Sequence, residues 1–245
     1  GDVAISTAGK VSKALTPKKK VKAYKLFRQD KDNKLFPLYI GTKEEIPLKK
    51  WVQATSGELT KGGKVKSTIG DLAYRPGWHA GDSPQATHIG EFTEAQIKAR
   101  AGVVEKRVAA MAKQKINPKA EKGSEDHKKR LKINKEIPFP KGSSQPSYRA
   151  DNQVWAEIEM ANDIDWQSVA NAAAKLNKEG VIVPKTAQIT DQVPLGGFYR
   201  YKTQPNMTGN WLIGGDMKVK RVLDDSEVMK INEAAGVADL PRRPK

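Results

Sequence analysis

A strict alternation of side chains constrains the fold of this chain more than any other feature. Residues 154–160 place Val, Ala, Ile and Met on one side and Trp, Glu and Glu on the other. A strand with one buried face produces this period of two. Because Glu157 and Glu159 lie on the polar side, we expect them to face solvent rather than to form a catalytic carboxylate pair. The sequence therefore predicts a strand here with one buried face.

Capping patterns predict the helices. Thr93 and Gln96 form a capping box, so we expect a helix over about 93–115. Asp165 caps a second helix from 166 to about 177, and Asp224 caps a last helix that ends at Gly236. The first helix carries a stripe of apolar residues: Ile97, Ala101, Val104, Val108 and Met111.

The remaining apolar runs predict strands. Residues 24–26 and 35–36 flank a polar turn and predict a hairpin. Leu48, Trp51 and Val52 lie at helical spacing, which predicts a short helical segment over 48–54. Segments 181–183, 196–201, 211–213 and 217–223 predict later strands. Because strands and helices do not alternate regularly, we expect the α+β class, with a small, mainly antiparallel sheet, either continuous or split, and about three helices.

The pattern also predicts how the chain is organised. Residues 1–22 are lysine-rich and poorly patterned, which is typical of a basic N-terminal arm. We expect residues 23–223 to form a single α+β domain that carries a helical and basic insertion at 92–150. Most of that insertion, from 117 to 150, shows little periodicity and is interpreted as a basic linker. Residues 224–245 form a C-terminal helix and tail.

The charge balance points to an anionic partner. The chain holds 44 Lys and Arg against 28 Asp and Glu, a formal net charge of +16. Such a surplus attracts phosphate or another acidic surface. Tyr24, Phe139 and Tyr148 lie near the basic segments, where they could stack on bases. We expect nucleic acid or an acidic protein surface to contact two clusters: Lys18, Lys19 and Lys20 in the arm, and Lys128, Lys129 and Arg130 in the insertion.

Several classes of protein are disfavoured. The absence of cysteine excludes disulfides, thiolate metal sites and cysteine nucleophiles. His79, His88 and His127 lack the close spacing of a zinc site, so we expect no metal. No stretch approaches the length of a membrane span, so we expect no membrane partner. The glycine pairs lack the flanking residues of nucleotide-binding loops.

One segment could hold a small ligand. Pro76 and Gly77 force a turn beside Arg75, Trp78 and His79. These three side chains could grip a phosphate or a nucleotide ring with a guanidinium fork, a stacking face and a hydrogen-bond donor. Alternatively, Trp78 belongs to the core, Arg75 pairs with a carboxylate and His79 bonds a backbone carbonyl. The sequence leaves both readings open.

Residues 23–28, 73–80, 196–202 and 211–219 carry a resemblance to known proteins. In these segments the chain resembles accessory domains of the large polyvalent proteins of phages and mobile elements. More loosely, the order of strands from about 23 to 223 is similar to the ADP-ribosyltransferase fold. The first resemblance implies a phage protein, located in the virion or in the bacterial cytoplasm, with other subunits of a phage assembly as further partners.

The second resemblance implies NAD as a cofactor. An Arg or His on the first strand of that fold and a polar residue on the second hold NAD, and a late glutamate promotes transfer. Carried over to this chain, Arg28 or His79 takes the first role and Ser83 the second. Arg75 and Trp78 add cofactor contacts, and Glu179 is the candidate catalytic carboxylate, because the closing strand itself offers Asn210 and Asp216.

Three hypotheses follow. The first is a non-catalytic binding protein, without a cofactor, that engages nucleic acid or another acidic surface through its basic segments. The alternative is an NAD-dependent ADP-ribosyltransferase that modifies host protein or nucleic acid. The third is a structural piece of a larger assembly, in which the extended arm wraps a neighbouring subunit. Binding that weakens steeply with salt would favour the first.

Overall fold

The computed structural model describes residues 16–176, 182–184, 192–203 and 206–245 of the chain. It divides into two compact units. One comprises Gly1–Gln85 and Asp151–Asp239, and the other comprises Ala86–Ala150 and Leu240–Lys245. We refer to them as the sheet unit and the helical unit.

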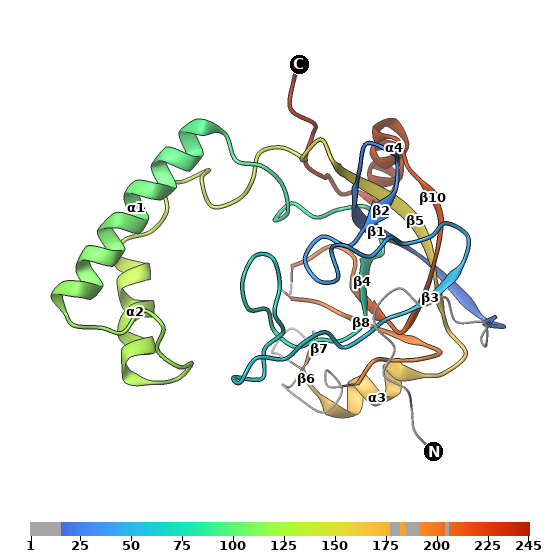
Figure 1. Cartoon of the computed structure of the whole chain (residues 1–245), viewed down its shortest axis with the longest axis horizontal. Helices are drawn as coiled ribbons and strands as arrows, with labels where there is room; N and C mark the ends of the chain where they lie inside the picture. Colours follow the sequence, from blue (N-terminus) through green and yellow to red (C-terminus); the bar gives the residue numbers. More distant parts are fainter. Residues whose placement is uncertain (1–15, 177–181, 185–191, 204–205) are drawn as a thin grey trace. The chain divides into compact units, whose positions relative to one another are not determined.

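The sheet unit is built on one open, antiparallel sheet of eight described strands (Figure 1). The α+β class and the antiparallel sheet expected from the sequence are confirmed. Seven strands follow one another across the sheet, and β2 (Leu35–Phe36) pairs with β1 beside this path. Their order is β3 (Trp51–Gln53), β10 (Asp216–Val222), β5 (Gln153–Ala161), β1 (Lys20–Gln29), β4 (Trp78–Gly81), β9 (Trp211–Gly214) and β8 (Phe198–Tyr201).

The sheet is continuous but narrow at one junction. Strands β1 and β5 pair along their whole length, from Lys20 opposite Ala161 to Arg28 opposite Gln153. Strands β1 and β4 share a single register pair, Tyr24 with Gly81. The half with β3, β10 and β5 is therefore joined to the half with β9 and β8 over a very short ladder.

Alternation along β5 buries one face in the core, as the sequence predicts. Ile158 and Met160 are fully buried together with Phe27 of β1 and Val219 of β10. The opposite face is not uniformly exposed, because Trp155 is also buried and its indole N–H donates to Asp239 at 2.7 Å. This second face is therefore covered at Trp155 and partly exposed at Glu157 and Glu159.

The last helix is α4 (Asp225–Ala235), which lies close to β5 and β10 in Figure 1. Its capping box of Asp224 and Glu227 is present, and Gly236 ends it at φ 70°, which a residue with a side chain adopts only at a cost. Buried Asn232 donates to the Pro84 carbonyl at 2.9 Å, which ties the helix to the turn after β4.

A second small cluster lies around β8. Helix α3 (Trp166–Ala173) contacts this strand, and Ala170 packs with Tyr199 and Ile213. The indole N–H of Trp166 donates to the Leu195 carbonyl at 2.9 Å. A two-stranded ladder, β6 (Ala174–Leu176) with β7 (Ile182–Pro184), follows in the chain.

The prediction of a helical segment over 48–54 is wrong, because this segment contains β3. Trp51 pairs with Lys218 on β10, and the Lys49 N–H donates to the Val219 carbonyl at 2.8 Å. Helical spacing of three apolar residues cannot be told from a short strand without its partner strand. Here the partner follows more than 160 residues later in the sequence, at Asp216–Val222.

The helical unit contains α1 (Glu94–Lys113) and α2 (Glu125–Glu136), which lie side by side. Helix α1 confirms the capping box of Thr93 and Gln96. Helix α2 falls within the segment interpreted as a linker, and with it the described chain has four helices, close to the number expected. Ser124 caps α2, and Ile133 is its buried residue. One buried position in twelve residues is too weak an apolar pattern to indicate a helix.

Candidate polyanion-binding face

The outer face of the sheet carries a row of aligned side chains across four strands. Register places Trp51 of β3 beside Lys218 of β10, Lys218 beside Glu159 of β5, and Glu159 beside Lys22 of β1. Lys20 lies two residues before Lys22 and therefore on the same side of β1. Together with Lys220, these lysines form a surface that we call the basic face: Lys20, Lys22, Lys218 and Lys220.

Glu159 is the centre of the basic face. Its carboxylate lies 3.1 Å from the Lys218 ammonium, 3.4 Å from that of Lys220 and 3.7 Å from that of Lys20. Burial alone would raise the pKa of this carboxyl, but the three lysines outweigh burial and lower the pKa. One negative charge therefore stands against three positive ones, and exposed Lys22 adds a fourth.

The arm lysines adjoin this surface. The backbone N–H groups of Lys18 and Lys19 donate to the Asp163 carboxylate at 3.0 and 2.7 Å, and these bonds lower the pKa of that carboxyl. Both lysine side chains are exposed. The predicted cluster of Lys18, Lys19 and Lys20 thus lies at the start of β1. Sequence reasoning missed Lys22, Lys218 and Lys220, although the alternation of residues 217–223 placed two of them on one side of a strand.

The second predicted cluster lies on α2 in the helical unit. Lys128 pairs with Glu125 at 2.7 Å, and the Arg130 guanidinium donates to the Pro118 carbonyl. Lys129 is exposed. An i,i+3 pair on a helix surface contributes only a few tenths of a kcal/mol, so it holds its lysine weakly. The two predicted clusters belong to different units.

The aromatic side chains near the basic segments contact the chain itself. Tyr24 is buried in the sheet. Phe139 lies under the guanidinium groups of Arg100 and Arg107, at 4.2 and 4.4 Å from its ring centre. Tyr148 lies under that of Arg243 at 5.0 Å. On the basic face, Trp51 is covered by the Lys218 ammonium at 5.2 Å. This surface therefore offers cations rather than rings for base stacking.

In the segment around β4, Trp78 points to the opposite side of the strand from His79. Trp78 is buried, and its indole N–H donates to the Val52 carbonyl at 2.9 Å. His79 points to the opposite side of the strand, where it is exposed and its Nε2 lies 2.7 Å from the Arg75 carbonyl oxygen. The Arg75 guanidinium lies over the Tyr201 ring at 5.5 Å. Arg75 and His79 are thus brought together, whereas Trp78 belongs to the core.

The electrostatics of β4 keep His79 neutral at physiological pH. Desolvation of the part of the ring that packs against the protein is the main cause that lowers the pKa of His79; the bond to the Arg75 carbonyl opposes this shift, and the charges of Lys25 and Arg75 add to it. Lys25, which the sequence analysis did not single out, lies at the junction of β1 and β4. Its ammonium donates to the His79 carbonyl at 2.8 Å and lies near the Phe27 and Trp78 rings at 5.6 and 5.8 Å. Desolvation lowers the pKa of Lys25 to about 8.

The other candidate NAD residues have separate surroundings. Arg28 donates to the Thr42 carbonyl at 2.6 Å and stacks on the Phe36 ring at 4.6 Å. Ser83 lies in the turn after β4, where its carbonyl accepts from the Gln85 N–H at 2.8 Å. Glu179 lies outside the described residues.

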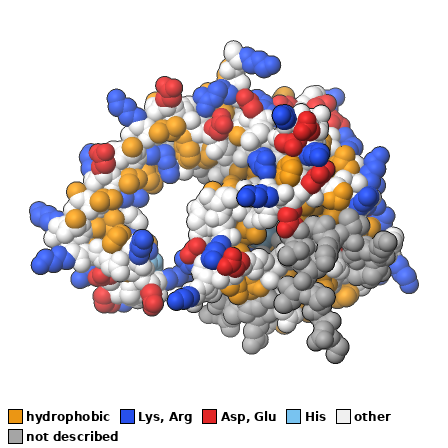
Figure 2. All heavy atoms as spheres, viewed as in Figure 1, with side chains coloured by type: hydrophobic (Ala, Val, Ile, Leu, Met, Phe, Trp, Pro, Cys, Tyr) orange, Lys and Arg blue, Asp and Glu red, His pale blue; other side chains and the backbone are white. Residues whose placement is uncertain are grey.

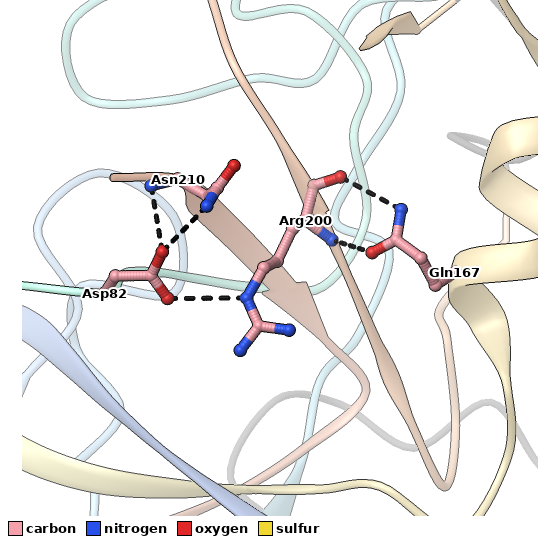
Figure 3. Close-up of polar contacts among 4 residues, drawn as sticks. All are labelled: Asp82, Gln167, Arg200 and Asn210. Atoms are coloured by element: carbon pink, nitrogen blue, oxygen red, sulfur yellow. Dashed lines mark hydrogen bonds and ion pairs between the residues drawn. The ribbon is translucent and has the colours of Figure 1, made fainter. Parts of the chain in front are cut away.

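Asp82, next to Ser83, joins three parts of the sheet unit (Figure 3). Its carboxylate accepts from the backbone and side-chain amides of Asn210 at 3.0 and 2.9 Å and from the Arg200 Nε at 3.4 Å. Gln167 of α3 in turn bonds the backbone N–H and carbonyl of Arg200 at 2.7 and 3.3 Å. Asn210 is thus a structural partner of Asp82. Asp216 is buried and accepts from the Gly196 N–H at 2.7 Å.

The described residues show neither a metal-binding cluster nor a membrane-spanning helix. Among them, no group of three or more His, Asp or Glu side chains is arranged to hold a metal ion. None of their helices is both long and apolar enough to cross a bilayer.

Comparison with known proteins adds no relative. No family model, no curated protein and no solved structure matches the chain. The resemblances to large polyvalent proteins and to ADP-ribosyltransferases therefore stay predictions, and the geometry of the side chains is what bears on function.

Proposed function

We propose that this protein is a non-catalytic binding protein that engages nucleic acid through the basic face. The observation that carries the proposal is the convergence of Lys20, Lys218 and Lys220 on the single carboxylate of Glu159. Folding brings like charges together here from strands at opposite ends of the sequence. A phosphate backbone would supply the anions that this surface lacks.

The composition of the face defines the expected mode of binding. It presents ammonium groups, which are point charges, without an exposed ring for stacking or an arginine fork for a base edge. Contacts to phosphate are sequence-independent, and each one releases counterion. Binding should therefore depend steeply on salt and little on base sequence. The location of the protein in the virion or bacterial cytoplasm is part of the same proposal.

An anisotropy titration with a labelled duplex at about 50 and 200 mM salt tests the proposal. The variant K22Q/K218Q/K220Q removes three charges from the face, and K31Q/K61Q/K64Q removes three exposed lysines elsewhere in the sheet unit. The first variant should bind at least about tenfold more weakly and lose up to about three units of salt slope. The second should bind almost as the unchanged protein does.

A third variant, K128Q/K129Q, separates the two predicted clusters. If it weakens binding as much as the face variant does, the helical unit also binds the duplex. Equal binding by all three variants, or no binding at low salt, would refute the proposal for the basic face.

The NAD hypothesis draws less support from the site. Arg75 and His79 lie together on an exposed side of β4, but buried Trp78 offers no stacking face to a ligand and Arg28 is engaged by Thr42 and Phe36. Transfer from labelled NAD to a bacterial lysate, lost in Glu179→Gln, would support this alternative and overturn the non-catalytic proposal.

A further inference from the structure

The apolar stripe of α1 is exposed over most of its length. The exposed fractions are 57% for Ile97, 48% for Val104 and 55% for Val108. Figure 2 shows hydrophobic side chains following this helix. Aliphatic side chains scattered singly on a surface need no explanation, but a contiguous row marks an interaction surface.

The spacing of the stripe is that of a coiled-coil seam. Its members, at positions 97, 101, 104, 108 and 111, are separated alternately by four and three residues. This is the spacing of a heptad in which 97, 104 and 111 are d positions and 101 and 108 are a positions. A neighbouring helix covers these positions when the two helices pack with nearly parallel axes. A helix with such a seam fits another helix of the same kind.

One flank of the seam already contacts other residues of the helical unit. Arg100 donates to the Ser143 carbonyl at 2.7 Å, and Arg107 donates to the carbonyls of Ile137 and Asn134 at 2.9 and 3.1 Å. Val103, on the same side of α1, is the buried residue of the helix. The flank with the g positions (Arg100 and Arg107) and the c position (Val103) is therefore already in contact with the chain, whereas the flank with the e positions is open.

The open flank carries complementary charges. Lys98 and Glu105 occupy two of its e positions, and the ion pairs within the described part of the helical unit involve neither of them. They lie seven residues, or about 10.5 Å, apart along the helix, too far to pair with each other. In an antiparallel pair of helices the e positions face one another, so Lys98 would lie opposite Glu105 of a second copy, and the pair would occur twice. A parallel pair would instead need Arg100, whose guanidinium is engaged.

We propose that a second copy of this chain docks on this stripe, with the two α1 helices antiparallel about a two-fold axis. Ile97 then packs against Val108 of the second copy, and Ala101 against Val104 of the second copy. Such an interface is isologous, so one surface serves both copies. The seam is about 21 Å long, so it buries a small area for a specific interface. We therefore expect a dissociation constant of about 10–100 µM.

Sedimentation velocity of the full chain over about 5–500 µM tests the proposal. The unchanged protein should pass from monomer to dimer in this range. Val104→Lys should keep the chain monomeric throughout, because it places a charge in the seam of each copy. Lys98→Glu should raise the dissociation constant at least about fivefold, since both ion pairs become like-charge contacts. The double variant K98E/E105K restores both pairs with the signs exchanged and should dimerise within about twofold of the unchanged protein.

Lys106→Glu is the matched control, because it makes the same change of charge at an exposed position on the far side of α1. It should leave the dissociation constant within about twofold. Circular dichroism of each variant confirms that the helices are intact. A chain that is monomeric at every concentration, or a dimer that survives Val104→Lys, overturns the proposal. Dimerisation that Lys98→Glu and Lys106→Glu weaken equally overturns the antiparallel arrangement.

Discussion

Lys218 and Glu159 lie opposite each other on β10 and β5, and the ammonium is 3.1 Å from the carboxylate. The same carboxylate also holds Lys20 and Lys220. It thereby offsets the repulsion among lysines that strand pairing forces together. It also cancels part of the positive charge that a phosphate would meet, so stability and binding should respond to it in opposite directions.

Replacing Glu159 with Gln should lower stability and raise affinity. We expect the free energy of unfolding to fall by about 1–2 kcal/mol, because three ammonium groups lose their shared partner. Affinity for a duplex at low salt should rise severalfold, because the face gains one net positive charge. Urea unfolding and anisotropy titration measure the two effects. Glu58→Gln, which breaks an exposed pair with Lys66, is the control and should change neither quantity. A loss of affinity in Glu159→Gln would contradict the proposed face.

The contribution of Glu159 should also depend on pH. Burial would raise its pKa, but the lysines outweigh burial, and the pKa in the folded state is lowered. A carboxyl with a lowered folded pKa stabilises the protein above its unfolded pKa, about 4.3, and loses this effect as the pH falls through the folded value. The difference in unfolding free energy between the unchanged protein and Glu159→Gln should be constant near neutrality and shrink below about pH 4. A difference that persists at pH 2 would exclude an ionic origin.

Lys25→Met should stabilise the sheet unit at pH 7. The pKa of Lys25 is lowered to about 8 by desolvation, so its charge is held at a cost. The gain should be about 1–3 kcal/mol in urea unfolding. The unfolded chain binds the lysine proton up to about pH 10.4, so the unchanged protein gains stability between pH 8 and 10, and the advantage of Lys25→Met should shrink there.

Lys22→Met is the matched control for this change. It alters the same residue type on the same strand, but at an exposed position on the opposite face. It should shift stability by less than about 0.5 kcal/mol at every pH. If both variants behave alike, the junction of β1 and β4 does not desolvate Lys25.

Asp82→Ala should destabilise the sheet unit by about 1–2 kcal/mol, because Asn210 and Arg200 lose their shared acceptor (Figure 3). Thermal unfolding measures the effect, with exposed Asp71→Ala as the comparison. A double-mutant cycle with Arg200→Gln should give a coupling energy of about 0.5–1 kcal/mol. Additive effects would show that the ion pair contributes nothing.

Two glycines should respond oppositely to alanine. Gly77 has φ 137°, and a Cβ there would lie 2.4 Å from the Ile213 side chain, so Gly77→Ala should cost at least about 2 kcal/mol. Gly102 lies within α1 with open space around it, so Gly102→Ala should add about 0.5–1 kcal/mol to the stability of the helical unit. Thermal unfolding distinguishes them, and a tolerant Gly77 would mean that the turn before β4 can shift.

Short-range patterns were sufficient for several elements. The hydroxyl of Thr93 and the side-chain amide of Gln96 accept hydrogen bonds from each other's backbone N–H groups, so four consecutive residues determine where α1 starts. The same holds for Asp224 and the left-handed Gly236 at the two ends of α4. The alternation in β5 likewise predicted which side of this strand enters the core.

Tertiary structure decided what those elements do. The segment with Trp51 is a strand because β10 pairs with it. Trp78 and His79 point to opposite faces of β4, so Trp78 bonds Val52 in the core whereas His79 contacts the Arg75 carbonyl on the other face. Lys20 and Lys218 lie almost two hundred residues apart in the sequence, yet both reach Glu159. By itself the sequence determined the caps, the alternation and the excess of positive charge, because each depends on neighbours along the chain. Only strand register could gather the lysines on one face, because register depends on partners that the chain brings together when it folds.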